Sequence, residues 1–185
     1  AVAARSTDLA SQVITAQTLM SGSGCCSLIG GGSAAPLAAA FVNAALIHIL
    51  DYDDIHDVGR LHPGAVVLPA ALAAAEIADA SDDVLIDAVA LATELMCRLG
   101  MACAPQGEGP GSEWFLTQLL GYIAASVAAG LALGLKQSEL VSGIGLAYMQ
   151  AAGGKQAGFG TGSTARAVYP AFAARAVHVA HVGTA

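Results

Sequence analysis

The chain has 185 residues, enough for one domain with a substantial hydrophobic core. Of these residues 56% are hydrophobic and only 11% are charged, with seven basic residues against fourteen acidic ones. These values exclude a disordered chain, a coiled coil and a nucleic-acid-binding protein, which needs a cationic surface. With so few charged side chains, we expect part of the surface to be apolar and covered by a partner subunit, by further chain or by lipid.

The predicted elements are helices separated by breaks. A Gly-rich run near the N-terminus, SGSGCCSLIGGGS, predicts a turn around a short extended piece. Pro36 at a first-turn position and the run Ser81-Asp82-Asp83 mark two helix starts, and Pro69 should bend its helix or delay its start. The Gly-rich stretch 106–112 is expected to be a loop, and the stretch 153–163 either a mobile loop or a close approach of the backbone to a ligand. The predicted helices cover residues 36–50, 64–78, 82–102, 115–134, 138–147 and 170–182.

One predicted helix raises the question of a membrane. Residues 115–135 carry no charge and are long enough to span a bilayer, but they lack flanking basic residues and an aromatic belt. Gly121, Ala125, Ala129 and Leu133 fall on one stripe, which lets helix backbones approach closely. We therefore expect a compact all-α bundle rich in Ala/Gly helix contacts and no membrane association, with an integral membrane bundle as the less favoured alternative.

The cysteines and the N-terminus bear on the cellular compartment. Cys25 and Cys26 are adjacent, Cys97 and Cys103 lie in helical sequence, and no CxxC or Cys/His zinc spacing occurs. No basic region followed by an apolar run precedes the first residues, so the sequence shows no signal peptide. We expect reduced thiols in a cytoplasmic protein (mitochondrial matrix in a eukaryote), and a single domain over residues 1–185 that is truncated at both ends.

A first polar cluster lies between two apolar helices. Residues 51–62 contain four aspartates, two histidines and one arginine. The segment fits a solvated acidic helix terminus, a metal site built from His48, Asp51 and His56, or an acid–base site. The metal hypothesis is less favoured because no HExxH or EF-hand pattern occurs. In the acid–base reading Asp51 or Asp54 pairs with the imidazole of His62 and sets its tautomer.

A second polar cluster follows the Gly-rich loop. Arg166 and Tyr169 stand at the start of a helix, where backbone amides favour anions and a guanidinium can bind a carboxylate bidentately. Lys155 is a further candidate, and Thr117 follows Trp114 and Phe115 at another helix start. The alternative is a surface arginine beside a core tyrosine. No GxSxG motif, P-loop or dinucleotide fingerprint is present, which excludes serine hydrolases, NTPases and Rossmann enzymes.

Three runs of the sequence resemble motifs of the MmgE/PrpD family. The run AAFVNAALIHILDYDDIHDVGRLHPGAVVLPAALAAAE is similar to A-F-x-N-G-x-x-x-H-x-L-D-[FY]-D-D-x-H followed by H-P-[SG]. EWFLTQLLGYIAASVAAGLALGL is similar to the G-[FW]-H-x-T-x-x-x-G helix of the family. TARAVYPAFAARAVHVAHVG is similar to its K-R-L-H-x-G-[FW]-A-A helix. The resemblance covers nearly the whole chain in family order.

The resemblance implies a fold and a chemistry. Family members have a large helical domain and a smaller α/β lid domain, and they form homodimers. This chain is expected to hold the helical domain only, starting after the family's first helix and stopping before the lid. Members remove a proton beside a carboxylate without a metal or cofactor, with loss of water or CO2 or inversion of the carbon. They include 2-methylcitrate dehydratase, cis-aconitate decarboxylase and iminodisuccinate epimerase.

Several positions depart from the family motifs. Arg166 stands where the family has Lys, Tyr169 and Phe115 where it has His, Ile55 where many members have Thr, and Ala44 where it has Gly. An arginine keeps the charge but cannot donate a proton near neutral pH, and a tyrosine donates one less readily than a histidine. These departures leave room for a different substrate or for lost activity.

The sequence therefore predicts a lyase-type enzyme that removes a proton beside a carboxylate of a small polycarboxylate. Dehydration of a 2-methylcitrate-like substrate and decarboxylation of an aconitate-like substrate both fit, and epimerisation stays open. The alternative is a non-catalytic helical dimerisation or scaffold module. No metal or cofactor is expected, and the expected partners are the substrate and a second copy. The candidate catalytic residues are His62, Asp51 and Tyr169, and the candidate substrate-binding residues are Arg166, Thr117, Asp54 and Lys155.

Overall fold

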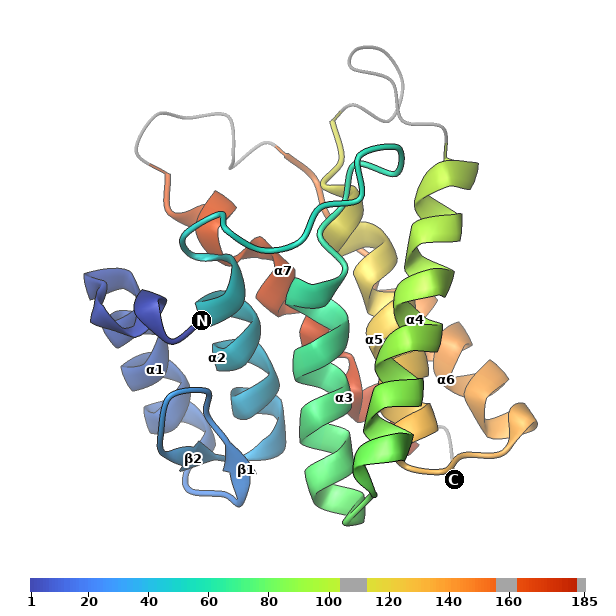
Figure 1. The fold of residues 1–185 in the computed structure, drawn as a ribbon, viewed down its shortest axis with the longest axis horizontal. Coiled ribbons are helices and arrows are strands. Elements are labelled where there is room, and N and C mark those ends of the chain that lie inside the picture. Colours follow the sequence, from blue (N-terminus) through green and yellow to red (C-terminus); the bar gives the residue numbers. More distant parts are fainter. Residues whose placement is uncertain (104–112, 156–162, 183–185) are drawn as a thin grey trace.

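The structure, a computed structural model, describes residues 1–103, 113–155 and 163–182. The predicted loop 106–112 and most of the loop 153–163 lie outside these residues. The fold is all-α, as predicted (Figure 1). A 3-10 turn, η1 (Ala3–Ser6), and two short strands, β1 (Cys26–Ser27) and β2 (Ser33–Ala34), complete it. The helices are α1 (Asp8–Ser21), α2 (Pro36–His48), α3 (Gly64–Ala78), α4 (Asp82–Ala102), α5 (Leu116–Ala132), α6 (Gln137–Gln150), α7 (Ala165–Ala174) and α8 (Val177–Val182).

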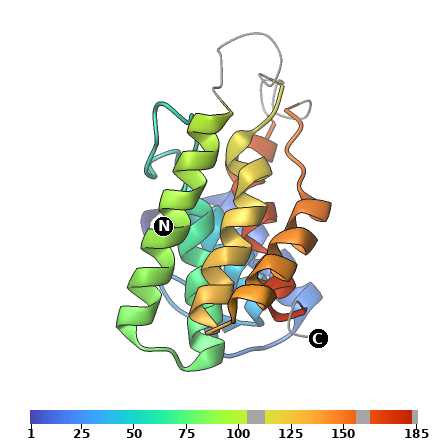
Figure 2. The ribbon, with the colours of Figure 1, turned by 90° about the vertical axis from the view of Figure 1, so that its right-hand side faces the viewer.

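The helices pack around α5. In Figure 1, α1 to α4 run side by side in chain order, and the turned view in Figure 2 shows α5 between α4 and α6. The central helix α5 packs against α3, α4, α6 and α7, and α7 also packs against α2. The antiparallel pair of β1 and β2 forms the predicted extended piece in the Gly-rich turn. The arrangement brings one end of α2, α3, α5 and α7 together.

Small side chains determine how closely the helices approach. Alanines make up most of the core residues of α2, α3 and α5. On the predicted stripe of α5, Gly121, Ala125 and Ala129 are buried, which confirms its packing role. A Cβ atom built on Gly121 would lie 2.9 Å from the Cβ of Ala173 in α7 and 3.1 Å from Cγ1 of Val66 in α3. Gly121 therefore lies at a close approach of α5 to both α3 and α7.

A pair of glycine variants tests this packing. Alanine is favoured over glycine inside a helix by roughly 0.5–1 kcal/mol, and the built Cβ of Gly145 in α6 has no neighbour within 4 Å. We expect Gly145→Ala to raise the free energy of unfolding by about that amount. Gly121→Ala should instead lower it by about 1–3 kcal/mol, because the methyl group overfills the contact. Urea unfolding followed by circular dichroism measures both values, and equal effects at the two sites would contradict the packing argument.

Two helical regions differ most from the predictions. The helix α1 was not predicted, although Thr7 caps it by accepting a hydrogen bond from the Ala10 N–H and Gly22 ends it with φ 72°. Only Ala10 of this helix is buried, so its sequence lacks a strong apolar face. The predicted helix 170–182 is in fact α7 and α8. The first of these starts at Ala165, and Pro170 lies inside it rather than at its start.

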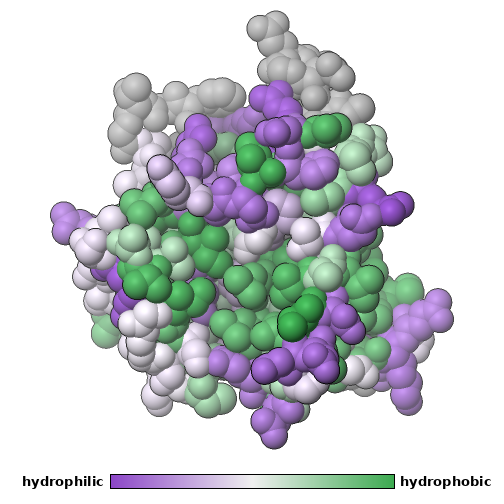
Figure 3. All heavy atoms as spheres, viewed as in Figure 1, coloured by the Kyte–Doolittle hydropathy of each residue, from purple (hydrophilic) through white to green (hydrophobic). Residues whose placement is uncertain are grey.

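The surface is apolar in part, as the composition indicates. Exposed large hydrophobic side chains include Leu19 and Met20 of α1 and Val141, Tyr148 and Met149 of α6. Figure 3 shows a further apolar band over α2 and α3, between hydrophilic regions at the two ends of the helices. Within the described part of the chain, no helix combines the length and the apolar character that crossing a bilayer requires.

Candidate active site

The segment 51–63, which connects α2 to α3, lies over one end of the bundle, where α3, α5 and α7 begin (Figure 1). Leu61 anchors it: this side chain is fully buried, and a Cβ built on Gly100 of α4 would lie 2.5 Å from its Cδ2. A bridge between His56 and Leu61, with a 2.8 Å bond from the His56 N–H to the Leu61 carbonyl, tightens the loop. The polar residues of the segment are therefore held in place by the core.

Asp54 takes a structural position. Both of its carboxylate oxygens accept from the Gly64 N–H, at 3.1 and 3.0 Å, where α3 begins. A carboxylate is favoured there because the N-terminus of a helix carries a partial positive charge. A Cβ on Gly64 would collide with the same carboxylate, so a larger residue here would displace the side chain of Asp54. The side chain of Asp54 does not pair with His62, which corrects the predicted pairing.

A buried pair of side chains joins the segment to α2. The carboxylate oxygen Oδ2 of Asp53 lies 2.8 Å from Nδ1 of His48, the last residue of α2, and the two side chains are 1% and 2% exposed. Burial by itself would raise the pKa of Asp53, but the hydrogen bond and the charges of His48 and His62 hold that pKa below its ordinary value. Asp53 is therefore an ionised carboxylate inside the protein.

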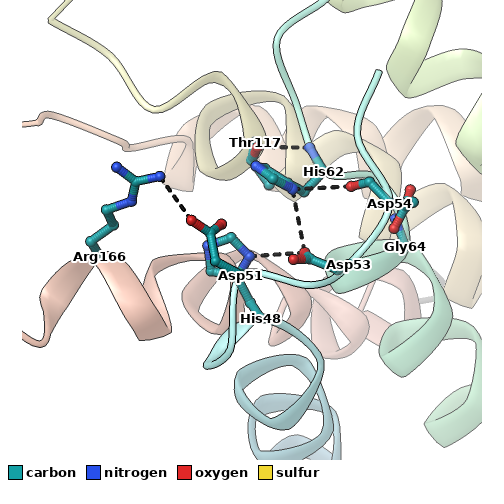
Figure 4. A network of polar contacts seen from close by, with 8 residues as sticks. All are labelled: His48, Asp51, Asp53, Asp54, His62, Gly64, Thr117 and Arg166. Atoms are coloured by element: carbon teal, nitrogen blue, oxygen red, sulfur yellow. Dashed lines mark hydrogen bonds and ion pairs between the residues drawn. The ribbon is translucent and has the colours of Figure 1, made fainter. Parts of the chain in front are cut away.

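His62 lies directly above this pair, with 17% of its side chain exposed. Its Nδ1 lies 3.0 Å from the backbone carbonyl of Asp54 and 3.5 Å from Oδ2 of Asp53 (Figure 4). A carbonyl oxygen can only accept, so Nδ1 carries the proton and Nε2 of the neutral ring keeps a free lone pair. The carboxylate that faces the ring is thus Asp53, not Asp51 or Asp54 as predicted.

Thr117 and Tyr169 attach His62 to α5 and α7. The buried Oγ1 of Thr117 accepts from the backbone N–H of His62 at 3.0 Å, and its side chain also hydrogen-bonds to Tyr169. The Tyr169 ring stacks on Phe115 at a centroid distance of 4.3 Å and meets the His48 ring edge-on at 5.0 Å. Burial raises the pKa of Tyr169 to about 12, so this phenol stays protonated near neutral pH.

The exposed rim of the site carries an ion pair. Nη2 of Arg166 lies 3.1 Å from Oδ2 of Asp51, and 63% and 52% of the two side chains are exposed. Asp51 has φ 53°, an uncommon conformation for a residue with a side chain, which turns the chain at the end of α2. The ammonium of Lys155 lies 5.7 Å from the centre of the Phe115 ring. The two cationic candidates are therefore placed by their neighbours, Arg166 by the carboxylate of Asp51 and Lys155 by the Phe115 ring.

The metal hypothesis was based on His48, Asp51 and His56. One donor atom each of His48, Asp51, Asp53 and His62 lies within 4.8 Å of the others. His56 is not part of this group, because its Nδ1 accepts from the Gly59 N–H at 2.9 Å. The facing atoms already serve hydrogen bonds and ion pairs, and Nδ1 of His62 is a donor (Figure 4). The four side chains could therefore work as an acid–base cluster or hold a metal ion.

Sequence reasoning did not single out Asp53, and it considered His48 only as a metal ligand. The spacing of the two residues could have indicated this pair, since a histidine that ends a buried helix lies within reach of a carboxylate five residues later. A separate pocket of about 630 Å³ lies elsewhere on the domain. Its lining is mostly apolar and contains none of the candidate residues: Ser21, Ala35, Pro36, Leu37, Ile77, Leu133, Arg175, Val177 and His178.

Comparison with known proteins agrees with the sequence motifs. A family model described as the MmgE/PrpD N-terminal domain matches residues 1–183. The chain belongs to the MmgE/PrpD family. It is 32% identical over 159 residues to cis-aconitate decarboxylase of Aspergillus terreus, which covers 82% of this chain and 32% of that protein. It is 34% identical over 161 residues to cis-aconitate decarboxylase-like protein oryM of Aspergillus oryzae, and this match covers 82% of this chain and 33% of that protein. The MmgE/PrpD domain described here thus spans about a third of the length of these relatives.

Proposed function

We propose that the protein carrying this MmgE/PrpD domain is a lyase that acts on a small polycarboxylate by metal-independent acid–base catalysis. The two relatives named above favour decarboxylation of an aconitate-like substrate, and dehydration of a 2-methylcitrate-like substrate uses the same groups. The observation that carries the proposal is the position of His62. Its Nδ1 lies 3.5 Å from the buried carboxylate of Asp53, and the same cluster includes Asp51, which pairs with Arg166.

The polar cluster is suited to a reaction that builds negative charge beside a carboxylate. In a decarboxylation, the carbon that loses CO2 keeps the electron pair, and an imidazolium at His62 delivers the proton that forms the new C–H bond. In a dehydration, neutral His62 takes the C–H proton at Nε2, and hydroxide leaves with a proton from a second donor. Arg166 would hold a substrate carboxylate, and a fixed cation stabilises such a transition state.

Tyr169, Asp54 and the helix N-termini have supporting roles in this proposal. Tyr169 stays protonated because burial raises its pKa to about 12, so it would donate a hydrogen bond or a proton and would not act as a base. Asp54 stabilises the start of α3 and would support the site without contacting substrate. The first residues of α5 and α7 also lie at this end of the bundle, and their partial positive charges favour a polyanion.

A second candidate function is a non-catalytic helical module. One observation favours it: Phe115, where the family motif has a histidine, stacks on Tyr169 and adds no proton-transfer group beside His62. In this case the fold would be kept while the chemistry is lost. Such a module would bind no polycarboxylate at the cluster.

Turnover assays on the full-length protein distinguish the lyase from the non-catalytic module. Incubation with cis-aconitate and, separately, with 2-methylcitrate, followed by NMR of the products, should show turnover of at least one of them. The turnover should persist after treatment with EDTA, because no step in the proposed mechanism needs a metal. Absence of product, together with no thermal stabilisation by di- or tricarboxylates at millimolar concentration, would favour the helical module.

A further inference from the structure

We infer that Asp53 and His48 form a buried positioning pair that controls the proton on His62. This inference rests on the proposed role of His62, but its contacts and its test are independent of which substrate is used. Asp53 would act through the charge of its carboxylate, and His48 would hold that carboxylate in place. Neither residue is expected to touch the substrate, since their side chains are 1% and 2% exposed.

The contacts give Asp53 a defined orientation. Its Oδ2 faces both imidazoles, at 2.8 Å from Nδ1 of His48 and 3.5 Å from Nδ1 of His62 (Figure 4). The rings of His48 and His62 meet at a centroid distance of 4.9 Å. His48 is itself held by the edge of Tyr169, so the carboxylate cannot turn away from His62 without breaking packed contacts. One carboxylate oxygen thus serves two histidines.

The other oxygen of the same carboxylate favours a functional role. Oδ1 of Asp53 is buried and has no hydrogen-bond partner among the described residues. A buried acceptor without a partner lowers stability, so a carboxylate with a purely structural role would be expected to have both oxygens bonded, as Asp54 does. The loss of stability from this unbonded oxygen is expected if the negative charge of Asp53 has a role in controlling the proton on His62.

The charge would stabilise protonated His62. When His62 takes a proton, the positive ring lies 3.5 Å from a carboxylate that His48 keeps ionised, so the imidazolium is favoured. In the neutral ring the backbone carbonyl of Asp54 accepts from Nδ1–H, and the nearby Asp53 carboxylate favours the same tautomer, which leaves Nε2 available. Other charged groups near the ring also affect the protonation of His62. The titratable and charged groups around His62 are His48 of α2, Asp51, Asp53 and Asp54 of the connecting segment, and Arg166 and Tyr169 of α7.

The test compares two carboxylate-to-amide changes in the same segment of the full-length protein. Asp53→Asn keeps the shape and removes the charge, so protonation of the His62 ring, followed by histidine NMR, should move to lower pH by about one unit. The acid limb of the kcat/KM pH profile should move in the same direction. Asp53→Glu restores the charge and should recover most of the shift. The exposed Asp57, changed to Asn, is the matched control and should leave both readouts at their wild-type values.

The outcomes separate the positioning pair from the proposed function. An unchanged His62 titration in folded Asp53→Asn overturns the pair, whether or not the protein is active. An inactive wild-type protein with the expected shift overturns the proposed function and supports the pair. If Asp53→Asn does not fold, His48→Phe keeps a ring but loses the donor. Carbon-13 NMR should then show Asp53 becoming protonated at a higher pH than in the wild type, and an unmoved titration would again overturn the pair.

Discussion

Changing His62 to Asn in the full-length protein is expected to lower kcat by about 10²–10⁴-fold, the range that a positioned acid–base group contributes. The amide NH2 of the introduced side chain can take the place of the Nδ1–H that faces the Asp54 carbonyl, so the segment keeps its hydrogen bond. The variant lacks the second ring nitrogen, which is the one that would exchange a proton with the substrate. Turnover assays and thermal unfolding measured together distinguish lost chemistry from lost structure.

His178 offers a control for this variant. It lies in α8, and its Nδ1 lies 2.6 Å from the Arg175 carbonyl, so His178→Asn keeps a similar local hydrogen bond. We expect this control to retain wild-type turnover. A His62→Asn protein that is folded and turns over within a factor of about two of wild type would remove His62 from the mechanism.

Much of the fold follows from local sequence signals. Pro36 begins α2, and Ser81 accepts a 3.4 Å hydrogen bond from the Val84 N–H at the start of α4. Both starts were predicted, because a capping residue acts within one turn of chain. The start of α7 was misplaced at Pro170, since the pattern of a first-turn proline was applied to a residue inside the helix. What decides that start is packing against α2 and α5, which sequence spacing does not contain.

The site was predicted in part. The sequence identified the segment 51–62 and the surroundings of Arg166, and the structure brings the two together through the ion pair of Asp51 and Arg166. It did not indicate which of four neighbouring aspartates faces His62. Asp53 faces inward between Asp51, which has a positive φ, and Asp54, whose carboxylate accepts from the Gly64 N–H. Both are properties of the folded loop rather than of residue type.

Arg166 is expected to have the second large effect. A charge-assisted hydrogen bond to a carboxylate contributes about 1.5–3 kcal/mol, so Arg166→Ala should lower kcat/KM by roughly 10–100-fold, mainly through a higher KM. Arg98→Ala is the matched control, because Arg98 is also exposed and paired with a carboxylate, that of Glu94 in α4. In steady-state kinetics Arg98→Ala should keep the wild-type kcat/KM while Arg166→Ala loses the expected roughly 10–100-fold. Equal kcat/KM values for the two variants would exclude Arg166 from substrate binding.

Two further variants define what Arg166 does. Asp51→Asn removes the carboxylate that occupies the guanidinium, so a substrate carboxylate no longer competes with it, and KM should stay the same or fall. Arg166→Lys keeps the charge but loses the two-pronged geometry, so binding should weaken if the guanidinium is an anchor. If kcat rises instead, the position serves proton transfer, which a lysine supports and an arginine does not. The sign of the change in kcat therefore decides between a carboxylate anchor and a proton donor at this end of α7.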